Sequence, residues 1–355
     1  MRYVPISSVH DGLTLGEDLY NEIGELLLAQ GCVLTKKNIQ SIRRLRYSGI
    51  YIDDEISKGI TVESIVSERV RAKTLKQIKD IFIDYEQGGQ NLNSNLDAIR
   101  LQIENIVDEI YSNQDLIVNL VELQAYDDYT YNHCVSVAIL SIALGVALSM
   151  GKQELYDLGF AALLHDIGKV FIDKAIINKP STLTTEEFEQ MKNHSFLGFE
   201  HIQSDYKVSD EILLGILDHH ERYDGSGYPS GKVGDQISWY GRIIATADVY
   251  DALTSERPYR KAVLPSDAME FIMASNTAQF DSTVVEAFTR KIAPYPLGTC
   301  VLLSNGFSAI VSGNCKESGL RPKVRVYKEK EIDVEPYEID LSDFEYLSTI
   351  IVEIL

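Results

Sequence analysis

The chain has 355 residues, with 33 Lys and Arg against 53 Asp and Glu, a formal net charge of −20 and a hydrophobic fraction of 45%. This composition is typical of a soluble globular protein and excludes a disordered, collagen-like or short disulfide-stapled chain. The acidic balance predicts no polymeric nucleic-acid partner, because a phosphate backbone binds basic surfaces. An anionic small molecule stays open, since it needs only a local cluster of cations.

The cysteines and the apolar segments predict a cytoplasmic protein. Cys32, Cys134, Cys300 and Cys315 are too irregularly spaced for a zinc knuckle or a CxxC pair, so we expect reduced thiols. The polar start MRYVPISSVHDGLTLGEDL predicts no signal peptide. The uncharged run 134–151 reaches the lower limit for a membrane span, but it contains serines and a glycine. We therefore expect a buried core helix and no membrane span.

Residues 1–60 predict a small α+β unit. The segment DLYNEIGELLLAQG is a hairpin candidate with its turn at 21–24. A helix follows, with Thr35 as its cap, apolar residues at helical spacing and Gly49 as its end. YIDDE then predicts a short strand.

Residues 61–125 predict a helical connector. Apolar residues recur at helical spacing over 61–87 and again over 96–124, and the polar, glycine-rich segment 88–95 separates the two runs. Such amphipathic helices pack within the chain or form a dimerisation arm. We favour packing within the chain, and a homodimer stays open.

The remaining chain divides into a helical and a β-rich part. Residues 126–293 show helical periodicity throughout, whereas 294–355 contain alternating segments, with a turn at 304–306 and the runs KVRVYK and STIIVEIL. The expected fold class is therefore mainly α. An all-helical core carries a small α+β unit before it and a small β-rich module after it.

Histidines and aspartates gather in the helical part in unusual contexts. The groups are His133, the pair His165-Asp166, His194, the pair His219-His220, and Asp248. A single histidine at the end of an apolar helix is more often a hydrogen-bonded core residue than a ligand. A carboxylate inside an apolar helix such as IIATADVYDAL is different, because burying it without a cation costs several kcal/mol. Shared divalent metal ions would account for all of these residues together.

The donor set also indicates which metals and which chemistry to expect. Imidazole and carboxylate without thiolate suit Fe, Mn or Zn. Five histidines and two aspartates exceed the needs of one ion, so we expect two ions about 3.5–4 Å apart that share one carboxylate, as in phosphoester hydrolases. In that arrangement the metals activate a water and stabilise both the attacking and the leaving oxygen.

These residues, in this order, resemble a known family. His133, His165-Asp166 and Asp248 are similar to the H…HD…D pattern of the HD phosphohydrolase superfamily. With HDIGK, HSFLG, HHERYDGSGYP and DVYDALTSERPYRKA, the segment from Tyr126 to about Thr289 resembles the HD-GYP domain family. The resemblance implies hydrolysis of cyclic di-GMP to pGpG or GMP by a hydroxide that two metal ions, iron or manganese, activate.

The resemblance also implies a role for each residue. Asp166 would bridge the metals; the first metal would take His133, His165 and Asp248, and the second His194, His219 and His220. Asp166 and Lys169 would be catalytic, and the substrate contacts would be Lys169, Asp251, Arg257 and Arg260. Asp251 could instead hold a histidine ligand. The tripeptide Gly227-Tyr228-Pro229 would shape its loop first and contact diguanylate cyclase domains second.

One departure and two alternatives limit these expectations. Some members carry a glutamate that recruits a third metal four residues before the first histidine; here that position is Tyr129, which favours two metals and leaves the product open. The chain could instead bind cyclic di-GMP or a diguanylate cyclase with little turnover. It could also hydrolyse another cyclic dinucleotide, such as cyclic GMP-AMP.

Overall fold

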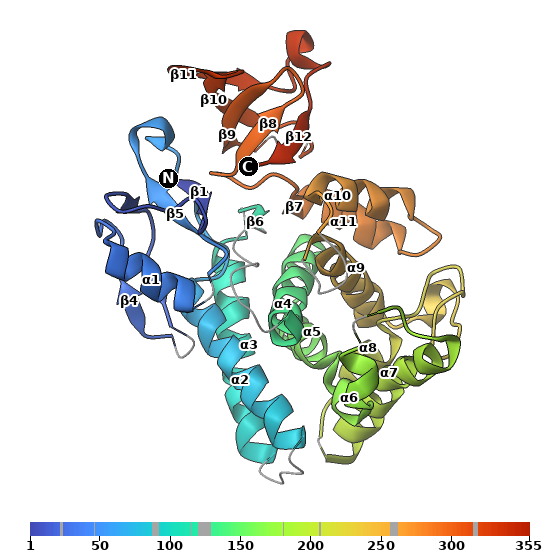
Figure 1. Cartoon of the computed structure of the whole chain (residues 1–355). Helices are drawn as coiled ribbons and strands as arrows, with labels where there is room; N and C mark the ends of the chain where they lie inside the picture. The colour runs from blue at the N-terminus through green and yellow to red at the C-terminus, as the bar shows by residue number, and fades with distance from the viewer. Residues whose placement is uncertain are drawn as a thin grey trace.

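The computed structural model describes the chain except at residues 22–23, 46, 87–91, 115, 120–128, 180, 206, 256–261 and 315–318. Two predicted substrate contacts, Arg257 and Arg260, and also Cys315, lie outside the described residues. The fold is mainly α, with small sheet units near both ends of the chain, as the sequence predicts (Figure 1).

The N-terminal unit contains the predicted hairpin, helix and strand. Its elements are β1 (Arg2–Pro5), β2 (Thr14–Leu15), β3 (Leu19–Tyr20), β4 (Leu26–Leu28), α1 (Lys36–Arg44), β5 (Gly49–Asp53) and the 3-10 turn η1 (Glu55–Ser57). A three-stranded sheet has the order β1-β5-β2, and β3 pairs with β4. The backbone N–H of Asn38 donates to the Thr35 hydroxyl at 3.2 Å, which confirms the predicted cap.

The predicted end of this helix was wrong. Helix α1 ends at Arg44, and Gly49 instead opens β5. A Cβ at this glycine would lie 2.3 Å from Cζ of the Tyr3 ring on the neighbouring strand. The glycine therefore serves a close approach between two strands and does not end the helix.

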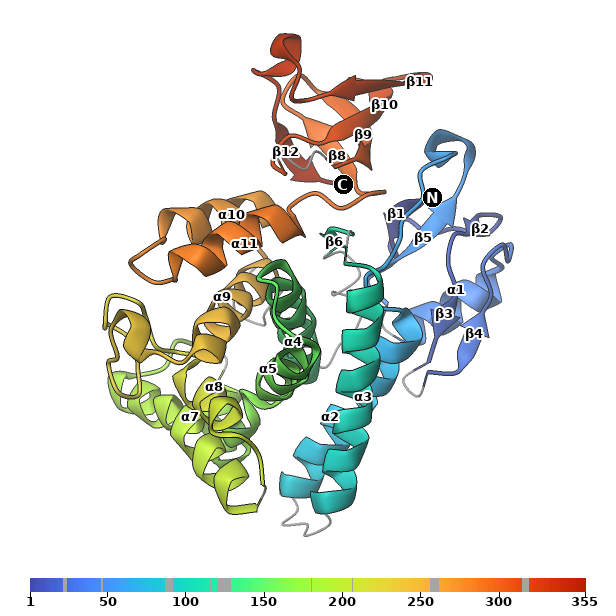
Figure 2. The same ribbon diagram turned by 180° about the vertical axis from the view of Figure 1, so that it is seen from behind.

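The connector forms two long helices with shifted boundaries. Helix α2 (Glu68–Glu86) begins seven residues later than predicted, and α3 (Leu92–Ser112) begins earlier and ends well before 124. The start of α2 is stabilised by a residue of another helix, because the Ser67 backbone N–H donates to Glu109 of α3 at 2.6 Å. Both helices pack on the helical core, as Figures 1 and 2 show, which confirms packing within the chain.

The helical core follows. It contains α4 (Tyr129–Ala147), α5 (Lys152–Leu164), η3 (Ile167–Phe171), α6 (Lys174–Ile177), α7 (Thr185–Asp205), α8 (Asp210–Asp218), η4 (Gly234–Gln236), α9 (Trp239–Thr254), α10 (Pro265–Ala274) and α11 (Ser282–Lys291). A strand pair at its edge joins β6 (Val118–Asn119) to β7 (Ile292–Ala293) in parallel. Helices α4, α5 and α9 contribute the most buried side chains and pack on one another.

Helix α4 confirms the expected buried core helix. Among the described residues it is the one helix long and apolar enough to cross a membrane, over Thr130–Ala147. However, 78% of that window is buried inside the protein. This burial fits a core helix of a soluble protein.

The C-terminal module is a five-stranded antiparallel sheet of order β11-β10-β9-β8-β12. Its elements are β8 (Cys300–Leu303), β9 (Phe307–Gly313), β10 (Lys323–Glu329), β11 (Ile332–Asp340), the turn η5 (Phe344–Tyr346) and β12 (Ile351–Ile354). The predicted turn at 304–306 joins β8 to β9, with Gly306 at a φ of 84°. Strand β11 went unpredicted because six of its nine side chains are exposed and Pro336 interrupts its short apolar alternation. The module lies beside the N-terminal unit (Figure 2). Arg325 Nη1 donates to the Lys58 carbonyl between the two.

Candidate metal centre

The predicted ligands converge from five helices of the core. His133 lies on α4, His194 on α7 and Asp248 on α9, while the pairs 165–166 and 219–220 directly follow α5 and α8. The described part of the chain contains two groups of side chains whose ligand atoms lie within 4.8 Å of one another. One group is His133, His165 and Asp248; the other is Asp166, His194, His219 and His220.

Asp166 lies between the two groups and faces each with a different oxygen. Its Oδ2 is 3.4 Å from His165 Nε2 and 3.8 Å from His133 Nε2. Its Oδ1 is 3.4 Å from His194 Nε2, in the other group. A carboxylate with this orientation can bridge two cations, one on each oxygen.

Backbone carbonyls orient three of the imidazoles. The Nδ1 atoms of His165, His194 and His219 each lie 2.7 Å from the carbonyl oxygen three residues earlier. These contacts place the proton on Nδ1, so Nε2 faces the site with its lone pair. His194 makes this contact from within α7, whereas His165 and His219 make it just past the ends of α5 and α8.

Protonation states also suit metal binding. Burial lowers the pKa of His194 to about 4 and that of His220 to about 3. Burial raises the pKa of the Asp166 carboxyl, but Lys169 and His165 outweigh it and hold that pKa well below its usual value. The second group therefore offers neutral imidazoles and an ionised carboxylate, the forms that coordinate metals.

His133 behaves differently in the chain without metal. Burial would lower its pKa, but hydrogen bonds with Asp248 and Asp251 raise it to about 9. Its Nε2 lies 3.0 Å from Asp248 Oδ1, and its Nδ1 lies 2.6 Å from Asp251 Oδ2. Asp251 thus holds the outer nitrogen of a candidate ligand, which is the second role that the sequence left open for it.

The residues present fit two divalent cations. His165 Nε2 and Asp166 Oδ1 are buried and have no hydrogen-bond partner among the described residues. In addition, His194 Nε2 lies 3.2 Å from His219 Nε2, although both nitrogens carry lone pairs under the protonation described above. Buried acceptors without donors are unfavourable, and a cation between them would satisfy them.

The folded stability of the metal-free chain should depend on pH through these imidazoles. In the folded chain His220 has its pKa lowered to about 3 from an ordinary value of 6.5. The unfolded chain therefore binds one more proton there, so stability is lost as pH falls from 6.5 toward 4. We expect His220→Gln to reduce this slope by up to about 1.4 kcal/mol per pH unit, the value for one proton.

This dependence can be measured by urea unfolding of metal-free protein between pH 4.5 and 6.5. His10→Gln serves as the control, because His10 is exposed and far from the core. Equal slopes in the unmodified chain and in His220→Gln would contradict the prediction.

Gly168 is a structural residue that the sequence reading missed. It lies in η3, where a Cβ would stand 1.9 Å from the His194 carbonyl oxygen and 2.5 Å from the Gly198 backbone nitrogen on α7. Only glycine permits this approach of two backbones, and the approach brings Asp166 near His194. The motif HDIGK contains the signal, but the reading did not assign its glycine.

We expect Gly168→Ala to destabilise the fold by about 3 kcal/mol, because the rigid backbone of α7 must move. It should also lower metal occupancy of the second group. The matched control is Gly198→Ala on the facing helix, where the nearest atom to a new Cβ is 3.2 Å away and alanine favours the helix. Chemical unfolding and metal analysis of both variants test this; equal loss of stability in the two would contradict it.

A buried ion pair and a carboxylate hold the loop after the histidine pair. Lys232 Nζ lies 2.7 and 2.9 Å from the two Asp218 oxygens, and Asp218 is fully buried. The backbone N–H groups of Ser230 and Lys232 donate to Glu221 at 2.7 and 3.1 Å. These partners could not be predicted from the sequence, because they meet only when the loop folds back.

The same loop carries the tripeptide at 227–229. A Cβ on Gly227 would stand 2.3 Å from the Arg222 backbone nitrogen, so this glycine permits a tight return of the chain. The Tyr228 ring packs at 4.7 Å from the His220 ring. These contacts describe a supporting role for the tripeptide beside the second group.

Lys169 lies at the edge of the centre. Its Nζ is 2.5 Å from Asp166 Oδ2, and 29% of its side chain is exposed. The ammonium therefore adjoins both the Asp166 carboxylate and solvent. A phosphate arriving from solvent would meet a positive charge at this point.

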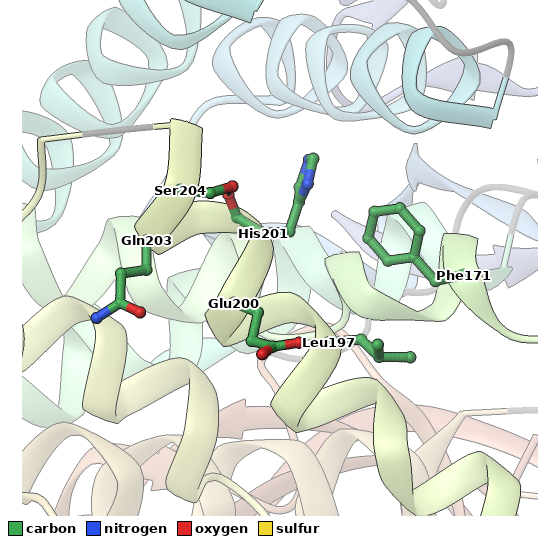
Figure 3. A pocket seen from close by; sticks show the side chains of 6 residues that line it. All are labelled: Phe171, Leu197, Glu200, His201, Gln203 and Ser204. Carbon is green, nitrogen blue, oxygen red and sulfur yellow. Dashed lines mark hydrogen bonds between the residues drawn. The ribbon is translucent and has the colours of Figure 1, made fainter.

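His201 lies outside the centre although it shares α7 with His194. It lines a pocket of about 480 Å³ together with Phe171 of η3 and with Leu197, Glu200, Gln203 and Ser204 of α7. Figure 3 shows these side chains. The His201 ring packs between Tyr85 and Phe171 at 4.5 and 4.9 Å. This pocket contains none of the predicted ligands, so the centre is defined by side-chain geometry and not by the size of a cavity.

A helical core with two adjoining histidine and aspartate groups defines a metal-binding HD domain. The HD domain family matches residues 112–284. An HDG"Y"P protein from Bdellovibrio bacteriovorus has the same fold, with a TM-score of 0.53 at 16% identity over 81% of this chain and 97% of that one. Residues 112–284 therefore carry an HD domain, and the chain is similar to HD-GYP proteins.

The chain is similar to relatives with two different named activities. The chain is 38% identical over 226 residues to a cyclic di-GMP phosphodiesterase of Pseudomonas aeruginosa, covering 62% of this chain and 54% of that protein. It is 39% identical over 156 residues to 3'3'-cGAMP-specific phosphodiesterase 3 of Vibrio cholerae, covering 43% and 33%. The chain thus spans about half the length, or less, of these relatives.

Proposed function

We propose that the chain is a metal-dependent phosphodiesterase that hydrolyses cyclic di-GMP to pGpG, GMP or both. The observation that supports this most is the position of Asp166 between the two groups. Its Oδ2 faces the group of His133, His165 and Asp248, and its Oδ1 faces the three histidines of the other group. Two bound divalent cations would supply Lewis acidity and an activated water at this point. Iron and manganese suit the nitrogen and oxygen donors, and a cytoplasmic site of action suits the unpaired thiols.

Each residue of the centre has a task that follows from its contacts. His133, His165 and Asp248 would hold the first cation, and His194, His219 and His220 the second, with Asp166 shared. Asp251 keeps His133 oriented through the 2.6 Å contact at Nδ1. Helix burial fixes these ligands before substrate arrives, so little reorganisation is needed during the reaction.

Lys169 would bind the phosphate at the solvent edge. Its ammonium lies 2.5 Å from Asp166, so a phosphoryl oxygen that contacts Lys169 also lies beside the bridging carboxylate. The lysine would offset the negative charge that develops on the phosphate during attack. Arg257 and Arg260 would provide further contacts to phosphate or guanine.

A second substrate has specific support. The similarity to a 3'3'-cGAMP-specific enzyme covers part of the same domain, so cyclic GMP-AMP is the rival substrate. Partner diguanylate cyclases that contact the 227–229 loop, and a homodimer, are further parts of the proposal. Tyr228 is half-buried against His220, so a cyclase would contact the exposed Pro229 first.

The test uses protein loaded anaerobically with Fe(II) or Mn(II) and a panel of cyclic di-GMP, cyclic GMP-AMP and cyclic di-AMP. We expect cyclic di-GMP to be hydrolysed with the highest kcat/KM, and chromatography identifies pGpG or GMP. His165→Ala is the inactive control. No turnover of any cyclic dinucleotide with two metals bound per chain would falsify the proposal.

A further inference from the structure

A positively charged and aromatic cluster adjoins the second histidine group. It consists of Phe188 and Lys192 on α7 together with Tyr228 of the loop. Lys192 Nζ lies 5.0 Å from the centre of the Phe188 ring and 5.7 Å from that of Tyr228. The Tyr228 ring also packs against the His220 ring, with the ring centres 4.7 Å apart, so Tyr228 contacts both the rest of the cluster and the second histidine group.

The cluster is accessible where the centre itself is buried. Phe188 is 46% exposed, and 27% of the Lys192 side chain is exposed. The helical spacing of four residues puts both side chains on the same face of α7. Glu189 Oε1 is 2.6 Å from Lys192 Nζ, but this carboxylate is itself largely exposed and can move into solvent.

These contacts match the second half of a cyclic dinucleotide. Such a molecule has two phosphates and two bases, so one phosphate stays outside the metal centre when the other is cleaved. A lysine suits a phosphate as a point charge, and an exposed aromatic ring provides a stacking surface for a base. Lys192 provides the charge and Phe188 provides the ring, and Tyr228 lies between this pair and the second histidine group.

We propose that Lys192 and Phe188 form a subsite for the uncleaved half of the substrate. Lys192 binds the second phosphate in place of Glu189, and Phe188 stacks on the adjoining base. The inference rests on the proposed function, because it requires a substrate with two phosphates and two bases. The subsite makes the chain selective for cyclic dinucleotides over simple phosphodiesters.

The experiment compares cyclic di-GMP with bis(p-nitrophenyl) phosphate, a diester with one phosphate and no nucleobase, on the metal-loaded full chain. For Lys192→Gln we expect the ratio of the two kcat/KM values to fall about 10- to 100-fold, the loss of one charge-assisted hydrogen bond. Phe188→Ala should lower it about ten-fold through lost stacking. Lys192→Arg and Phe188→Tyr should keep the ratio of kcat/KM values close to that of the unmodified chain.

Two controls separate binding from structural effects. Lys174→Gln removes an exposed lysine that pairs with Glu86, and the ratio should stay as in the unmodified chain. Glu189→Gln frees Lys192 and should not raise KM for cyclic di-GMP. A KM that rises in Glu189→Gln as much as in Lys192→Gln would overturn the subsite, because the pair would then act only by holding the helix.

The rates of the unmodified chain and of Lys192→Gln distinguish a failure of the subsite from a failure of the proposed function. If it hydrolyses both compounds and Lys192→Gln leaves their ratio unchanged, the subsite is wrong and the proposed function stands. If it hydrolyses the simple diester but no cyclic dinucleotide, both proposals are wrong.

Discussion

Replacing Asp166 with asparagine is expected to lower kcat for cyclic di-GMP by about 10³-fold or more. Asparagine keeps the shape of the side chain but removes its charge and one of its two oxygen acceptors. Since Asp166 faces both ligand groups, the change weakens both cation sites at once. The expected size follows from the loss of electrostatic stabilisation at the reacting phosphate by residues that act as a unit.

The measurement combines turnover with elemental analysis. We expect the unmodified chain to bind two metals and Asp166→Asn to bind fewer than two under the same loading. Asp173→Asn is the matched control in the same segment: Asp173 is exposed and caps α6 by accepting from the Ala175 backbone N–H, which asparagine does equally well. An Asp166→Asn protein with two metals and a rate within ten-fold of the unmodified chain would contradict the bridging role.

Local signals explain why much of the fold was predictable from sequence. Thr35 caps its helix as predicted, and the uncharged run in α4 is buried as expected. The ligand types were predictable for the same reason, since Asp248 in an apolar helix is costly unless a cation is near. Residue chemistry alone therefore indicated a metal centre before any arrangement was known.

Features that depend on distant contacts were not predictable. The start of α2 depends on Glu109, and the loop after His220 depends on the Asp218–Lys232 ion pair. Gly168 and Gly49 each permit a close approach whose partner lies elsewhere in the sequence. In each case one residue has an ordinary local interpretation, and its role appears only when the second segment is placed beside it.

Removing the metals is expected to abolish activity and also to lower the thermal midpoint, on the order of 5–10 °C. The reason is visible in the second group, where His194 Nε2 and His219 Nε2 lie 3.2 Å apart and Asp166 Oδ1 has no hydrogen-bond partner among the described residues. A ligand that binds only the folded chain stabilises it, and a cation at this point also satisfies these acceptors. Chelation should therefore remove the activity and lower the thermal midpoint together.

The measurement uses dialysis against dipicolinate, followed by anaerobic addition of Fe(II), Mn(II) or Zn(II). We expect activity and thermal midpoint to return with the ions, in two steps if the two groups differ in affinity. Asp166→Asn supplies the comparison, because its midpoint should respond less to chelation than that of the unmodified chain. A chelated protein that keeps half of its activity, or a midpoint unaffected by chelation, would show that the two groups hold no metal that matters for the reaction. The midpoint separates that result from a wrong substrate, since it reports metal binding whichever phosphodiester is cleaved.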